Sequence, residues 1–203
     1  MRYNDPMQIF LTVLAGYFIG SIPFGVIVSR LFNIDITKYG SGNIGATNVL
    51  RTLGVVPGII VLTLDLLKGT LAAYIGILAL KDPLLIVITG LAAILGHMFS
   101  VFIGFKGGKG AAIGLGVLLA IAPEIFLAAA LLVIIIIVLT RYVSLASIFG
   151  PWLVAALMYF LNKPLPYLWA TILVAILMVI KHIPNIKRLL AGTERKVGES
   201  ENV

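Results

Sequence analysis

The sequence predicts an all-α integral membrane protein, a polytopic bundle of about seven transmembrane helices. Of its 203 residues, 61% are hydrophobic and 11% are charged, and the mean hydropathy is +1.13. The apolar share of a soluble domain is nearer one half. Apolar runs of about 17 to 25 residues also recur along the chain, which is the length that crosses a bilayer. Cysteine is absent, which excludes disulfides, thiolate chemistry and cysteine-ligated metals.

Seven apolar runs are candidate membrane helices. The first is interrupted by the sequence GSIPFG at residues 20–25, which predicts a kink or the close approach of a neighbouring helix. It is too long for a signal peptide, and no small-residue cleavage site follows it, so we expect it to stay as a helix. The second run is long enough to tilt or break. The runs cover residues 8–32, 54–80, 84–103, 111–122, 125–140, 144–161 and 165–180.

The basic residues divide unevenly between the two ends of such a bundle. With seven crossings, one end carries only Arg2, Lys81 and Lys163, so by the positive-inside rule the N-terminus is outside and the C-terminus is cytoplasmic. The net charge of +7 therefore lies in cytoplasmic loops and predicts no nucleic-acid partner. The outer connections are short proline turns. We see no repeat and no soluble domain, so residues 1–203 are expected to form one membrane-integral domain. The basic residues of the cytoplasmic end are Arg30, Lys38, Arg51, Lys106, Lys109, Arg141, Lys181, Lys187, Arg188, Arg195 and Lys196.

Two cytoplasmic loops are rich in glycine. Residues 39–51 contain Ser41, Asn43, Asn48 and Arg51, and either Ser41 or Asn48 could cap a short half-helix whose amino end faces an anion. The alternative is a floppy linker. The loop GFKGGKG at residues 104–110 carries two lysines, and its glycines would allow backbone amides to close on a phosphate. The alternative here is an ordinary turn between two helices.

Ionisable residues also lie inside the apolar runs. Asp65 and Lys68 are three apart and can pair on one helix face, but intramembrane charges are costly and often mark a site, so a structural pair and support of a site both remain open. His97 is either a hydrogen-bonded packing residue or part of that site. Ser144 is interpreted as the cap of the sixth helix.

The last basic segment, residues 181–196, predicts an interfacial helix on anionic headgroups, because Leu189 and Leu190 lie beside four cations. His182 and Asn185 differ from this pattern, since they lie at the end of the seventh helix, at membrane depth. The polar tail at residues 192–203 is expected to be mobile at its end.

Together these segments predict a cytoplasmic mouth that opens onto lipid and binds phosphate. Such a mouth suits one or two substrates that bear a phosphate and a long acyl chain. The sequence contains no Gly-x-Ser-x-Gly motif and no His-x4-Asp motif, because Phe102 and Lys187 stand five residues after the two histidines. Carboxylates are too scarce for a magnesium site, so no metal is predicted.

Five motifs give the chain a resemblance to a known family. They lie at residues 20–25, 40–51, 65–69, 104–110 and 182–194, and they run in order from the first helix to the tail. This arrangement resembles the bacterial membrane-integral, acyl-phosphate-dependent glycerol-3-phosphate acyltransferases. The resemblance implies transfer of a fatty acyl group from acyl phosphate to the 1-hydroxyl of sn-glycerol 3-phosphate, giving lysophosphatidic acid and phosphate at the inner membrane, without a cofactor. Its partners would be the two substrates, membrane lipid and the enzyme that produces acyl phosphate.

The resemblance also implies roles for individual residues. Ser41, Arg51, His182 and Asn185 match residues important for activity, whereas Glu194 matches a more structural glutamate. Our hypothesis is that one phosphoryl group binds Lys106, Lys109 and the amides of Gly107, Gly108 and Gly110. Ser41, Asn43, Asn48, Arg51, His182 and Asn185 would hold the other phosphoryl group and the glycerol. His182 could act as a general base, but a phosphate oxygen could accept the proton instead. Asp65, Lys68, His97, Ser144 and Glu194 are supporting residues.

Two other classes of function remain alternatives. A secondary transporter or channel for a phosphorylated metabolite would also use broken helices and an intramembrane charge such as Lys68. Against it, the polar groups gather at one face and no inverted repeat is visible. A non-catalytic membrane scaffold would leave the two glycine-rich loops without a purpose.

Overall fold

The fold is entirely helical within the part of the chain that the structure, a computed structural model, describes, residues 5–199. All seven apolar runs form helices, which confirms the predicted all-α class. The helices are α1 (Pro6–Ser21), α2 (Phe24–Arg30), η1 (Ile36–Lys38), α3 (Ala46–Leu53), α4 (Val55–Leu80), α5 (Pro83–Met98), η2 (Val101–Ile103), α6 (Ala111–Ile121), α7 (Pro123–Thr140), α8 (Val143–Phe160), α9 (Leu165–Lys181) and α10 (Ile183–Leu190).

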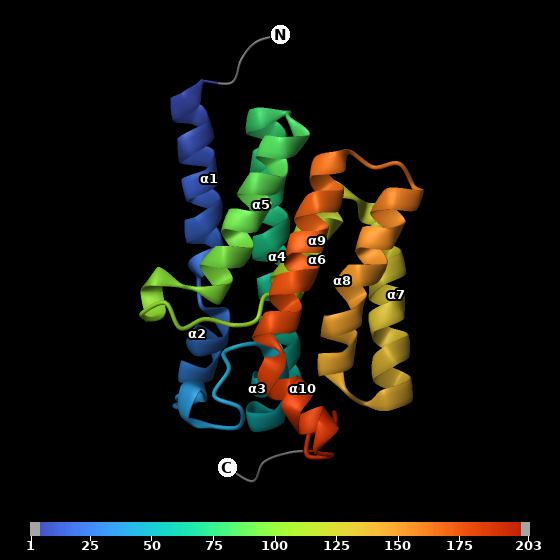
Figure 1. The fold of residues 1–203 in the computed structure, drawn as a ribbon. Helices are drawn as coiled ribbons and strands as arrows, with labels where there is room; N and C mark the ends of the chain where they lie inside the picture. The colour runs from blue at the N-terminus through green and yellow to red at the C-terminus, as the bar shows by residue number, and fades with distance from the viewer. Residues whose placement is uncertain (1–4, 200–203) are drawn as a thin grey trace.

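Several of these helices have the dimensions of membrane spans. Among residues 5–199, five segments are long and apolar enough to cross a bilayer, with α1 and α2 taken as one. A sixth results if α9 and α10, bent by 57°, are counted together. The apolar helix α6 has 11 residues, so it is about 17 Å long and spans only part of a hydrocarbon core about 30 Å thick. Seven crossings therefore remain a prediction. α1 begins at one end of the bundle and α10 lies at the other (Figure 1).

The first two runs behave differently. The break between α1 and α2 falls at Ile22 and Pro23, which confirms the predicted kink. α4 is unbroken over 26 residues. Its length of about 39 Å exceeds the thickness of the apolar core, so it can cross the core with some tilt.

Glycine allows the central helices to pack closely. α4 contacts α1, α3, α5 and α6, and α1 packs along α5. A Cβ atom added at Gly20 of α1 would collide with the carbonyl group of Ala93 on α5. Small residues of this kind let membrane helices approach backbone to backbone. α7 and α8 form a hairpin on the other side of the bundle, where α8 contacts α9 (Figure 1).

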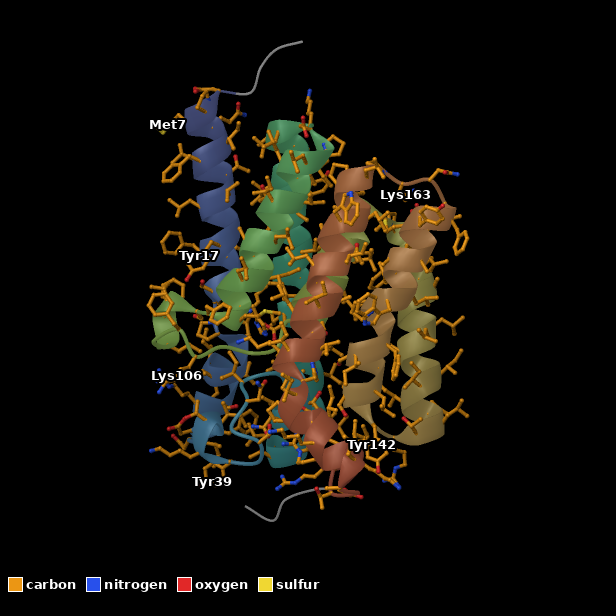
Figure 2. All side chains as sticks on the ribbon, in the orientation of Figure 1. Met7, Tyr17, Tyr39, Lys106, Tyr142 and Lys163 are labelled. Atoms are coloured by element: carbon orange, nitrogen blue, oxygen red, sulfur yellow. The ribbon has the colours of Figure 1, made fainter. Side chains whose placement is uncertain are left out.

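The two ends of the bundle differ in character. At the end where α1 begins, the connections are short, and an ion pair between Glu124 and Lys163 links two of them. Figure 2 shows Lys163 at this end, while Lys106, Tyr39 and Tyr142 lie toward the other. That other end contains the α2–α3 loop, the α7–α8 turn and α10 (Figure 1). The unusual loops therefore gather at one end, as the sequence predicted.

Candidate active site

Two hollows that share lining residues reach this end of the bundle. The larger has a volume of about 530 Å³. Its polar end is lined by α3 and α10, and its apolar remainder lies between α4, α5, α6, α7, α8 and α9. The smaller has a volume of about 270 Å³ and is mostly polar. Four residues line both hollows: Ser41, Asn43, Lys109 and Asn185.

The side chain of Asn48 organises the loop before α3. Its Oδ1 accepts a hydrogen bond from the Ser41 amide at 2.8 Å, and its Nδ2 donates to the Tyr39 carbonyl at 3.0 Å. The capping prediction was therefore wrong for both Ser41 and Asn48. Asn48 lies inside α3, and the N-cap residue is Gly45, without a side-chain cap. Asn43 also shapes the loop, because its Oδ1 accepts from the Gly45 amide at 2.8 Å.

Arg51 follows Asn48 by three residues on α3 and points into the larger hollow. Its Nη2 donates to the carbonyl of Arg195 at 2.6 Å, and its Nε is buried without a partner. Burial lowers the pKa of Arg51, while the nearby Glu194 carboxylate opposes that shift. The Arg195 carbonyl thus holds the guanidinium at one nitrogen beside the larger hollow.

The glycine-rich loop folds back on the end of α5. The amides of Gly107 and Gly108 donate to the carbonyls of Met98 and His97, at 3.2 and 3.0 Å. These two amides are consequently not free for phosphate, which corrects the predicted amide nest. The glycines are needed for a different reason: a Cβ atom at Gly107 would collide with the His97 carbonyl, and one at Gly108 with the His97 ring.

The amino end of α6 supplies the free amides instead. Gly110 is the N-cap residue of α6, with a left-handed φ of 97°. Gly110, Ala111 and Ala112 all line the larger hollow. The first amides of a helix have no partner within the helix and carry partial positive charge, so this end attracts anions.

The two lysines of the loop have different environments. Lys109 lines both hollows and donates from Nζ to Oδ1 of Asn185. Burial lowers the pKa of Lys109 to about 8, and the charge of Arg188 acts in the same direction. Lys106 is exposed and lines neither hollow. Figure 2 places it at the outer edge of the bundle, away from α10. The structure therefore does not bring Lys106 and Lys109 together, and a phosphate site shared by the two stays a prediction.

A chain of hydrogen bonds fixes Asn185. Its Nδ2 donates to Oε1 of Glu194 at 2.7 Å, so its Oδ1 faces Lys109. Nε of Arg188 donates to the other carboxylate oxygen of Glu194 at 2.7 Å. Burial acts to raise the pKa of Glu194, but the bonds from Asn185 and Arg188 outweigh it, and the net shift is downward. The Glu194 carboxylate thus orients an amide and a guanidinium, which agrees with the structural role that the resemblance implied.

His182 lies between α9 and α10, is buried, and lines the larger hollow. Its Nδ1 is 2.8 Å from the carbonyl oxygen of Met178. A carbonyl oxygen can only accept, so Nδ1 carries the proton and Nε2 is an acceptor. The imidazole therefore presents a hydrogen-bond acceptor as its free nitrogen.

The sequence prediction for Ser144 was wrong in detail. The helix begins at Val143 with Tyr142 as its N-cap residue, so Ser144 is inside α8 and does not cap it. Its buried hydroxyl lines the larger hollow, as Glu194 does.

Two site residues were missed by sequence reasoning. Lys181 and Arg188 line the smaller hollow together with Lys109, although the sequence suggested that they contact headgroups. The spacing of three residues between Asn185 and Arg188 could have placed them on one face of α10. Lys181 gave no such signal, because the bend between α9 and α10 separates it from Asn185.

The predicted pair of Asp65 and Lys68 is confirmed, with Nζ 2.7 Å from Oδ1. Asp65 and His97 line the larger hollow, at the side of α4 and α5. Within residues 5–199, no group of three or more histidine, cysteine or carboxylate residues is arranged to hold a metal ion.

The fold and the site define a helical integral membrane protein whose polar end can bind a phosphate beside an apolar groove. The profile of the glycerol-3-phosphate acyltransferase family matches residues 10–192. A glycerol-3-phosphate acyltransferase 2 of Moorella thermoacetica is 46% identical over 190 residues, which are 93% of this chain and 97% of that protein. A glycerol-3-phosphate acyltransferase of Aquifex aeolicus is 41% identical over 191 residues, 94% of this chain and 100% of that protein.

Solved structures agree with this match. The crystal structure of PlsY (YgiH), an integral membrane glycerol 3-phosphate acyltransferase, in its glycerol 3-phosphate form has a TM-score of 0.90 and 41% identity, covering 94% of this chain and 96% of that one. Its lysophosphatidic acid form has a TM-score of 0.88 with the same identity and coverage. The chain belongs to the glycerol-3-phosphate acyltransferase family of membrane-integral enzymes.

The different environments of the two loop lysines predict different effects on activity. Replacing Lys109 by Met should lower kcat/KM by about a hundredfold, the usual effect of removing a buried donor to a reacting charge. Replacing the exposed Lys106 by Met should change it by no more than about twofold. Acyl transfer by each purified variant measures both. Equal losses in the two variants would contradict the placement of Lys106 outside the site.

The lowered pKa of Lys109 predicts a pH dependence. Lys109 is charged below its pKa of about 8 and neutral above it, so phosphate binding should weaken as the pH rises through that value. We expect kcat/KM to fall on the alkaline side. Arginine stays charged throughout this range, so Lys109→Arg should be slower but should lose the alkaline fall. An unchanged fall in the arginine variant would assign the titration to another group.

Proposed function

We propose that the protein transfers a fatty acyl group from acyl phosphate to the 1-hydroxyl of sn-glycerol 3-phosphate, forming lysophosphatidic acid and phosphate. The observation that carries this proposal is the meeting of a polar hollow and a largely apolar hollow at Lys109 and Asn185. A transfer between a water-soluble phosphate ester and an acylated phosphate needs two such compartments that share a wall.

The smaller hollow suits glycerol 3-phosphate. Lys109, Lys181 and Arg188 line it and can neutralise a dianionic phosphate. Ser41 and Asn43 line it as well and can hydrogen-bond the glycerol hydroxyls. In this arrangement the phosphate lies toward α10 and the glycerol lies toward the shared wall.

The larger hollow suits acyl phosphate. Its apolar part, between α4, α5, α6, α7, α8 and α9, matches a fatty acyl chain. The positively charged Arg51, which lines this hollow, and the free amides at the start of α6 would bind the phosphate of the donor. This assignment replaces the earlier hypothesis that the amides of Gly107 and Gly108 bind one of the two phosphoryl groups.

The chemistry follows from the donor, a mixed anhydride that is already activated. The C1 hydroxyl oxygen of glycerol 3-phosphate forms a bond to the acyl carbon, and the bond from that carbon to the phosphate oxygen breaks. The departing phosphate takes the hydroxyl proton, directly or through Nε2 of His182, which is the acceptor in this structure. Cations and amides then mainly hold two phosphates near each other and stabilise the developing charge.

The proposal includes the orientation of the protein in the membrane and the part of the chain that forms the enzyme. The positive-inside rule favours a cytoplasmic site in the inner membrane of a bacterium, with the N-terminus outside. Residues 1–203 would act as one domain. Its donor would come from an enzyme that makes acyl phosphate.

The function is tested with purified protein, acyl phosphate and labelled glycerol 3-phosphate. We expect labelled lysophosphatidic acid and one inorganic phosphate for each acyl group transferred. A second experiment distinguishes the transporter alternative. The protein is placed in sealed vesicles and labelled glycerol 3-phosphate is added outside, because a transporter would move the label inside unaltered. Transport without product would overturn the proposal.

The apolar part of the larger hollow predicts that a substitution at Gly150 changes the preference for acyl-chain length. A Cβ atom added there meets only the Val133 side chain, at 3.9 Å, so a larger side chain would project into the groove. Gly150→Leu should lower kcat/KM for a long-chain acyl phosphate by about tenfold more than for a short-chain one, since each excluded methylene costs roughly 0.8 kcal/mol.

A matched control is available on the same helix. Ala156 of α8 is exposed and does not line the groove, so Ala156→Leu should leave the ratio for the two chain lengths unchanged. Equal losses for both chain lengths in Gly150→Leu would place the acyl chain elsewhere.

A further inference from the structure

A buried ionic cluster lies beside the site and has no part in the mechanism above. Nζ of Lys68 is 2.7 Å from Oδ1 of Asp65, 2.7 Å from the carbonyl oxygen of Ile22, and 3.0 Å from Nδ1 of His97. The three side chains of this cluster, Asp65, Lys68 and His97, are each at most 4% exposed. The ammonium group of Lys68 thus makes two hydrogen bonds, to the Ile22 carbonyl and His97, and an ion pair with Asp65.

The geometry of Lys68 fixes the ring of His97. Because the ammonium group of Lys68 can only donate, Nδ1 of His97 accepts and its proton is on Nε2. Nε2 faces the Cα atom of Gly108 so closely that a Cβ there would collide with it. The ionic cluster thus sets the orientation of a ring against which the glycine-rich loop packs.

The backbone next to that ring holds the same loop. The carbonyl groups of His97 and Met98 accept the amides of Gly108 and Gly107. The next residue is Lys109, which reaches Asn185 across the two hollows. The ionic cluster is therefore linked to Lys109 through the His97 ring, the backbone hydrogen bonds of Gly107 and Gly108, and the peptide bond between Gly108 and Lys109.

The cluster is poorly explained as a source of stability. Burying an ion pair costs desolvation that its attraction often fails to recover, and apolar residues in its place can be neutral or stabilising. Intramembrane charges therefore point to function. Asp65 and His97 line the larger hollow, so this cluster is part of the wall of the site.

We propose that Asp65, Lys68 and His97 are positioning residues, which hold the glycine-rich loop so that Lys109 meets both substrates. This inference rests on the proposed function of Lys109. Its consequence is specific: losing the cluster should harm the reaction through Lys109, and it should do nothing further once Lys109 is gone.

The test is a double-mutant cycle of His97→Leu and Lys109→Met, with folded protein in the membrane measured for each variant. His97→Leu removes the acceptor of Lys68 and the ring against Gly108. We expect kcat/KM for glycerol 3-phosphate to fall by about a hundredfold, as for a small misplacement of a catalytic group. The KM for glycerol 3-phosphate should rise, and His97→Leu should cost little more in the Lys109→Met background.

Two further variants keep the test decisive if His97→Leu folds poorly. His97→Gln keeps an acceptor and a donor and should recover part of the activity. The double variant Asp65→Asn with Lys68→Met removes both charges together and leaves no unpaired ion, and it should reproduce the rise in KM.

A matched control is Thr70→Val. Thr70 also ties α4 to a neighbouring helix, through its hydroxyl bond of 2.9 Å to the Gly116 carbonyl, but it lines neither hollow. Its effect should be small and additive with Lys109→Met. Full additivity of His97→Leu with Lys109→Met, or a loss confined to the amount of folded enzyme, would overturn the positioning role. If Lys109→Met itself retains normal activity, the proposed function of Lys109 is what fails.

Discussion

The hydrogen bond from Lys109 to Asn185 joins the two parts of the chain on which the site depends. Lys109 comes from the loop between α5 and α6, and Asn185 comes from α10, 76 residues later. A further hydrogen bond fixes each partner. The amide of Gly108, next to Lys109, donates to the His97 carbonyl, and Asn185 donates to Glu194. Lys109 and Asn185 each line both hollows, so the bond between them forms part of the wall that the hollows share, together with Ser41 and Asn43.

The bilayer explains why several of these polar groups are paired in series. A polar group without a partner is costly in an apolar medium. The chain meets this constraint with groups that satisfy one another in series, as in Arg188, Glu194, Asn185 and Lys109. Such a series has few alternative arrangements, so it also fixes the geometry that binding requires. The hydrogen bonds that satisfy these buried polar groups therefore also hold them in place for the substrates.

Sequence reasoning recovered the elements better than their details. Long apolar runs identify membrane helices because the thickness of the bilayer imposes their length, and all seven runs are helical. Whether a given polar residue caps a helix depends on the path of the loop before it. Asn48, for example, has the chemistry of a cap but bonds Ser41 and Tyr39 instead.

The burial of each residue distinguishes the two lysines of the glycine-rich loop, whereas the composition of the loop does not. Lys106 and Lys109 are equivalent in the motif, yet only Lys109 faces the hollows. The glycines of that loop suggested free amides, but the space they provide is occupied by His97. Lys181 was assigned to headgroups because its place in the smaller hollow depends on the 57° bend between α9 and α10. A one-dimensional pattern does not contain that bend.

The short length of α6 gives the site its depth. A full span would place its amino end at the membrane surface, where water would compete for its free amides. With 11 residues, α6 begins inside the bundle, beside Lys109, and its partial positive charge acts where water is scarce. An acyl phosphate bound there could keep its chain among the helices while its carbonyl group reaches the polar hollow. The short α6 therefore lets an acyl donor that stays among the helices react with an acceptor that stays in the polar hollow.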